Sequence, residues 1–240
     1  MLHPTRQLLG VLLAGTLLVP IHGATSEDLD QSPTVESFSG AIAFTPPNRG
    51  APARRIGGGS RGDKTQLLMS ALVPPQTGLT SQTQPILYWF ISQAVNTPLD
   101  LAITVPNEEN PVLEIRLPSP SRPGIQGIDL AKLGIKLKPD VEYQWSVSLV
   151  NDDTHRSADT FVAGSVVRTT DGNGGTVDCR QHGRIQQATA YAAQGLWYDA
   201  LQCLNQLVDQ KNTPEHRLQR GTLLAQGDLK AIAQWLETHP

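Results

Sequence analysis

The chain has little charge, few aromatic residues, only two cysteines and no hydrophobic run long enough to span a bilayer. Of its 240 residues 17% are charged and 5% are aromatic, and the net charge is −3. Duplex nucleic acid is therefore not an expected partner, because neutralising phosphates requires a basic face. The one long apolar stretch, residues 8–19, is far shorter than the roughly 20 residues that a membrane-spanning helix needs. The 21 glycines and 18 prolines instead predict much turn and loop.

Residues 1–24 predict a secretory signal peptide. Arg6 precedes the apolar run, Pro20 breaks it, and the small residues Gly23 and Ala24 follow, which is the order of parts in such a signal. We therefore expect export to the periplasm or the cell exterior, with no membrane span once the signal is removed. No cysteine lies near this end, which excludes a lipid anchor at the cleavage site.

The two cysteines, Cys179 and Cys203, are expected to be unpaired. If Gly195 turns a helical hairpin, the two thiols lie at unequal distances from the turn. At a rise of ~1.5 Å per residue the stagger is about 12 Å, beyond the ~7 Å Cα limit for a bridge. The sequence thus predicts no disulfide.

Residues 25–64 form a linker rich in Pro, Gly and Ser, in which a short apolar piece, residues 39–44, could add as an edge strand. Residues 65–170 then show short strands separated by turn residues, which predicts a β-sandwich of about seven strands, fibronectin- or immunoglobulin-like. Apolar residues alternate most clearly around Tyr143 and Trp145, so one face of that strand should lie in the core. The expected strands are residues 67–73, 86–92, 99–105, 112–117, 125–130, 141–150 and 161–169.

The segment between Leu137 and Tyr143 resembles a tyrosine corner. In fibronectin- and immunoglobulin-like sandwiches a strand Tyr hydroxyl satisfies a backbone group at the crossover between sheets. An ordinary strand start is the alternative.

Residues 176–240 change to helical spacing. We expect a helix capped by Asp178 and ending at Gly195, and a second one from Trp197 to about residue 211. Thr213 and Pro214 should open a third, and Asp228 should cap a fourth. An offset of 32 residues superimposes Gly195 on Gly227, close to the 34-residue tetratricopeptide spacing. Two such units are fewer than a free-standing solenoid needs, so this region should pack on the sandwich or on a partner.

A glycine-rich loop is the most conspicuous candidate site. It matches both a dinucleotide-binding and a nucleophile-elbow fingerprint, but no buried strand precedes it and no βα alternation follows. We therefore expect no cofactor and no catalysis, with a hydrolase using Ser60 the least favoured reading. The loop could bind an anionic group of a glycan, lipid or phosphate, although glycines that set backbone angles in a solvated linker explain it more simply. Its residues are Arg54, Arg55, Gly57, Gly58, Gly59, Ser60 and Arg61.

An acidic turn is the candidate for a metal. Asn151, Asp152 and Asp153, with His155 and Asp159, could hold a hard cation, but they lack the alternating oxygens of a calcium loop. We favour a solvated turn and expect no metal site.

An ordered series of segments resembles the bacterial family called domain of unknown function 928. The resemblance runs from about Gly50 to the C-terminus, and it implies location and domain limits without a mechanism. In that family a cysteine usually follows the Arg-Gly pair and another follows the strand ending near Val150. Both of these cysteines are absent here, so the resemblance implies that other members join them in a disulfide and that this chain lacks that disulfide. The segments are residues 50–62, 71–74, 78–80, 85–90, 123–125, 137–150, 156–159, 195–201 and the last helix.

Together these patterns predict an exported, non-enzymatic protein. A β-sandwich would precede a small tetratricopeptide-like helical region, and the role would be protein interaction or scaffolding at the cell envelope. The alternative is a module that binds an anionic ligand through the Arg/Gly loop.

Overall fold

A computed structural model describes residues 40–47, 58–59, 67–156, 159–170, 175, 177–180 and 185–239. The chain separates into two compact units, Met1–Ser37 and Phe38–Pro240, and all the described residues belong to the second. The predicted signal peptide and most of the predicted linker lie outside the described residues.

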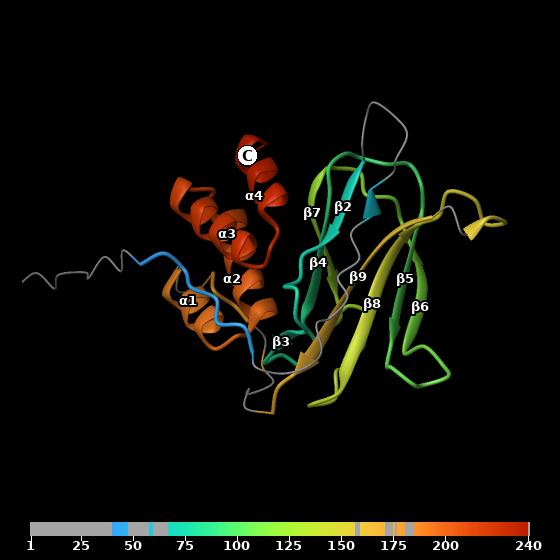
Figure 1. The fold of residues 1–240 in the computed structure, drawn as a ribbon, viewed down its shortest axis with the longest axis horizontal. Helices are drawn as coiled ribbons and strands as arrows, with labels where there is room; N and C mark the ends of the chain where they lie inside the picture. Colours follow the sequence, from blue (N-terminus) through green and yellow to red (C-terminus); the bar gives the residue numbers. More distant parts are fainter. Residues whose placement is uncertain are drawn as a thin grey trace, which may run out of the picture. The chain divides into compact units, whose positions relative to one another are not determined.

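The strands form two sheets (Figure 1). The first has the order β1-β2-β4-β7 and is antiparallel throughout; it comprises β1 (Gly58–Gly59), β2 (Leu68–Ala71), β4 (Ile86–Ile91) and β7 (Gly124–Asp129). The second has the order β3-β9-β8-β5-β6, in which only the β3–β9 pair is parallel. It comprises β3 (Gly78–Thr80), β9 (Thr160–Arg168), β8 (Glu142–Leu149), β5 (Leu99–Thr104) and β6 (Leu113–Leu117).

All seven expected strands are confirmed to within two residues at each end. The alternation in β8 has the expected consequence: Tyr143, Trp145, Val147 and Leu149 are buried, whereas the residues between them are partly or fully exposed. Strand β3 was not expected, since three residues carry no periodicity and their partner β9 lies far along the chain.

The crossover before β8 is fixed by the Tyr143 hydroxyl. It accepts a hydrogen bond from the backbone N–H of Lys138 at 3.1 Å, which is the contact that the tyrosine-corner pattern predicts. Leu137 is buried beside it, and its N–H donates to the carbonyl of Thr83.

Four helices follow the strands: α1 (Ile185–Ala193), α2 (Trp197–Gln210), α3 (Pro214–Gln226) and α4 (Lys230–Thr238) (Figure 1). The expected cap of α3 is confirmed, because the Thr213 hydroxyl accepts from the N–H of His216 and Pro214 occupies the first turn. Two other caps were wrongly predicted. Residues 177–180 are not helical, so no helix begins at Asp178, and α4 follows Leu229 without a side-chain cap. No helix within the described ranges is long and apolar enough to cross a membrane.

Helix α2 is buried on nearly all its sides, because it packs against helices α1 and α3 and against strands β3 and β4. The Tyr198 hydroxyl joins it to the second sheet: it accepts from the indole N–H of Trp145 and donates to the carbonyl of Ser165, both at 3.0 Å. The helical region was expected to pack either on the strand region or on a partner, and it packs on the sheets.

The two hairpins repeat at 33 residues rather than 32. Gly195 lies in the turn of the first hairpin with φ of +75°, and its counterpart in the turn of the second hairpin is Asp228, with φ of +60°. In each turn the next residue donates its N–H to a carbonyl five residues earlier, Leu196 to Tyr191 and Leu229 to Leu224. Gly227 has a φ of −81°, unlike Gly195, so the two glycines do not occupy equivalent positions in their turns.

Cys179 and Cys203 form a disulfide, and the prediction of unpaired thiols was wrong. The error came from placing Cys179 on a helix. Residues 177–180 instead run beside α2, where the amide of Gln206 binds the N–H of Cys179, and the two Cα atoms are 5.3 Å apart. The disulfide therefore joins the segment after β9 to helix α2.

Candidate functional site

Residues 40–47, which we call the strap, form no strand, so the edge strand that residues 39–44 could have added is absent from the described residues 40–44. They are held by two glutamines of helix α3, seven residues apart. Gln219 Oε1 accepts the N–H of Ile42 at 2.7 Å, and Gln226 donates to the carbonyl of Ile42 at 2.7 Å and accepts the N–H of Phe44. Gln219 also donates to the carbonyl of Gly40 at 3.5 Å, so each side-chain amide supplies the donor and acceptor that a neighbouring β-strand would offer.

Side chains at the start of the strap, residues 41–44, are alternately exposed and packed against the helices. Ile42 is 1% exposed, and the ring of Phe44 meets Trp197 edge-on with ring centroids 5.0 Å apart. Ala41 and Ala43 are exposed. The surface that receives the strap, which we call the groove, therefore holds apolar side chains at two alternate positions and leaves Ala43 between them exposed.

Gly195 admits the strap at the turn between α1 and α2. A Cβ atom there would lie 2.9 Å from the carbonyl oxygen of Thr45, too close for a real contact. The N–H of Thr45 donates to the carbonyl of Ala192, at the end of α1. Gly195 thus serves both the left-handed turn and the close approach of the strap.

Trp197 connects the groove to the rest of the fold. It is fully buried, and its indole N–H donates to the carbonyl of Leu72, just after β2, at 2.8 Å. Its ring also lies against Gly227, where a Cβ would be 2.1 Å from the nearest ring atom. The strap, the end of α3 and the first sheet therefore meet at one indole.

A buried carboxylate fixes the other side of α2. Asp199 accepts hydrogen bonds from the hydroxyl of Thr80 (3.0 Å), the N–H of Ser81 (2.7 Å) and the amide of Gln82 (2.8 Å). Burial raises the pKa of Asp199 above its ordinary value although these three donors act in the opposite direction. Because these three donors come from the end of β3 and the residues just after it, the Asp199 carboxylate holds α2 against that segment.

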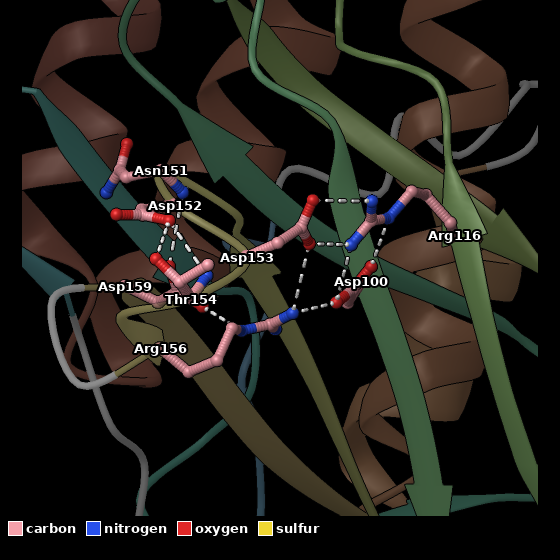
Figure 2. A network of polar contacts seen from close by, with 8 residues as sticks. All are labelled: Asp100, Arg116, Asn151, Asp152, Asp153, Thr154, Arg156 and Asp159. Carbon is pink, nitrogen blue, oxygen red and sulfur yellow. Dashed lines mark hydrogen bonds and ion pairs between the residues drawn. The ribbon is translucent and has the colours of Figure 1, made fainter.

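The acidic turn after β8 is an ion-pair cluster (Figure 2). Asp100 on β5 binds Arg116 (2.9 Å) and Arg156 (2.7 Å), and Asp153 binds Arg116 (2.7 Å). The hydrogen bond from Arg116 lowers the pKa of both Asp100 and Asp153. Arg116 therefore occupies Asp153, one of the carboxylates that were considered for a cation.

The remaining acids of that turn also have partners: Asp152 accepts from the N–H and hydroxyl of Thr154, and Asp159 binds Arg156 at 2.7 Å. Across the part of the chain that the structure describes, no three His, Cys, Asp or Glu side chains gather as a metal site would require. The cluster ties the β8–β9 turn to strands β5 and β6.

The glycine-rich loop falls largely outside the described residues. Only Gly58 and Gly59 are described; they form β1 and pair with Met69 and Leu68 of β2. Arg54, Arg55, Gly57, Ser60 and Arg61 lie outside, so both the anion-binding and the hydrolase readings stay predictions.

Sequence reasoning missed Gln219, Gln226 and Asp199. Two glutamines seven residues apart on one helix were a signal, because that spacing places both on one face. Their partner could not be anticipated, since the strap precedes them by more than 170 residues.

A family model described as Domain of Unknown Function (DUF928) matches residues 56–236. The chain belongs to this family. The match includes the strands, α1 to α3 and most of α4, and with them Gln219 and Gln226, whereas the strap precedes it. No curated protein and no solved structure matches the chain.

Proposed function

We propose that this DUF928 chain is an exported, non-enzymatic protein-interaction or scaffold module of the cell envelope. In this proposal the two sheets form a fibronectin-like sandwich, and the paired helical hairpins form a small tetratricopeptide-like region. The observation that carries it is the groove: the helical region already binds an extended stretch of polypeptide through backbone-directed glutamines.

The disulfide supports the exported location. Disulfides persist in oxidising compartments and are rare in the cytosol. Together with the apolar N-terminal stretch, the Cys179–Cys203 bridge favours a periplasmic or extracellular site for the folded chain.

Site-specific photo-crosslinking in the native host tests the proposal with the full chain. A photoreactive residue replaces either Gln194, exposed beside the turn at Gly195, or Glu114, exposed on strand β6. We expect a defined adduct with another envelope protein from position 194 and none from position 114. Adducts from neither position, or only from position 114, would overturn the helical region as the interaction surface.

A further inference from the structure

We propose that the groove is a peptide-binding site that the strap fills within the same chain, and that its partner is an extended segment of another protein with a branched aliphatic and an aromatic residue at alternate positions. This inference rests on the proposed function and names the chemistry of the ligand.

Recognition in the groove is directed mainly at the backbone. Gln219 and Gln226 bind N–H and carbonyl groups of Ile42 and the N–H of Phe44, which every non-proline residue presents. Such contacts give affinity without reading most of the sequence, as in the addition of a strand to a sheet edge. A segment from elsewhere can make them equally well.

Specificity comes from two side-chain positions. The first takes the fully buried Ile42, and the second sets the half-buried ring of Phe44 against the indole of Trp197. Ala41 and Ala43 are exposed, so the positions before and between the two are unrestricted. The ligand is therefore an extended apolar–x–aromatic stretch.

The groove and its present occupant also differ in their relation to the family. Gln219, Gln226 and Trp197 lie inside the region that the DUF928 model matches, whereas the strap lies before it. The residues that bind the strap thus lie inside the matched region, and the strap lies N-terminal to it.

The attachment sets how strongly the strap competes. Ten residues of sequence separate Pro47 from Gly58, and attachment through a stretch of that length gives effective concentrations on the order of millimolar. A free peptide with the same contacts therefore binds the unmodified chain poorly. Loosening the strap should expose the groove.

The test uses the full chain with I42S and F44S together, and a fluorescein-labelled peptide with the sequence of residues 39–48 as the probe. We expect fluorescence anisotropy to show saturable binding to this variant, at least about tenfold tighter than to the unmodified chain. Adding Q219A and Q226A should weaken binding by about tenfold or more, because both backbone-binding amides are lost. The matched pair Q187A and Q234A, exposed on α1 and α4, should leave it unchanged.

Equal binding to the loosened and unmodified chains, or binding indifferent to Q219A and Q226A, would overturn the inference. If the double variant loses helical circular dichroism, F44A alone replaces it, since that change removes only a half-buried ring. Analytical ultracentrifugation of the unmodified chain provides a second arm: dimers that disappear in F44A would assign the groove to a second copy and overturn a foreign partner. Crosslinks without peptide binding would refute the groove as a peptide-binding site and leave the proposed interaction function standing. Peptide binding without crosslinks would refute the proposed interaction function and leave the groove as a peptide-binding site.

Discussion

Replacing Gly227 by alanine should destabilise the fold strongly. The new Cβ would lie 2.1 Å from one ring atom of Trp197 and within 2.9 Å of two more, and that ring is fully buried. The ring must therefore move, which strains a packed interior and stretches the hydrogen bond from its indole N–H to the carbonyl of Leu72. Overpacking of this kind costs about 1–3 kcal/mol, and a buried polar group left without its partner costs about 1–3 kcal/mol more.

We therefore expect G227A to lower the free energy of unfolding by about 2–6 kcal/mol in urea titrations. For a chain of this size that lowers Tm by roughly 5–15 °C. The backbone itself predicts the opposite sign, because φ at Gly227 is −81° and alanine there would gain about 0.4–1 kcal/mol from the unfolded state. A loss of stability in G227A would therefore come from the contact with the Trp197 ring and not from the backbone conformation.

Gly175→Ala is the matched control. Nothing lies within 4 Å of a Cβ built on Gly175, so this variant should change stability by less than about 0.5 kcal/mol. Equal effects of G227A and G175A, or stabilisation by G227A, would refute the assignment of Gly227 to the packing of Trp197.

Three further predictions concern the disulfide, the buried carboxylate and the ion-pair cluster. C203S should lower the free energy of unfolding by about 3 kcal/mol in urea titrations, because the bridge closes a loop between residues 24 apart; an unchanged urea midpoint would contradict this. D199N should cost about 1–3 kcal/mol by placing an amide donor opposite hydrogen-bond donors. Since the folded pKa of Asp199 is raised, the folded state takes up its proton first. The contribution of Asp199 to wild-type stability then rises as the pH falls towards about 4, and the deficit of D199N must grow with it, whereas a constant deficit would refute the buried charge. The pKa of Asp153 is lowered in the wild type, and in R116Q it should return towards 3.8 in an NMR titration. The stability that Asp153 contributes above that pH, and that is lost as the pH falls below it, should then shrink. An unchanged pKa of Asp153 would show that Arg116 is not the cause of the shift.

The strands could be predicted from sequence because each has a local signal. Turn residues separate the seven expected strands, period-two alternation marks β8 most clearly, and Pro214 with Thr213 marks the start of α3 through local hydrogen bonding. The contact from Tyr143 to Lys138 spans only five residues. Family membership likewise followed from an ordered series of short segments.

Features that join distant segments could not be predicted. Cys179 was placed on a helix because its neighbours allow one, but residues 177–180 instead hydrogen-bond to the side chains of α2 and bring the two cysteines together. Asp228 has a good capping side chain, yet it adopts the left-handed turn that Gly195 adopts in the first hairpin. In both cases tertiary contacts outweighed a weak local preference.

The amino-acid sequence by itself determined seven of the strands, the order in which strands and helices follow, the turns between them and the family, since these depend on interactions between near neighbours. The tertiary structure alone decided that the strap lies on α3, that Asp199 is buried beneath three donors, and that one indole joins the strap to a sheet. These contacts bring together residues more than 100 positions apart, and their geometry exists only once the helices have packed on the sheets.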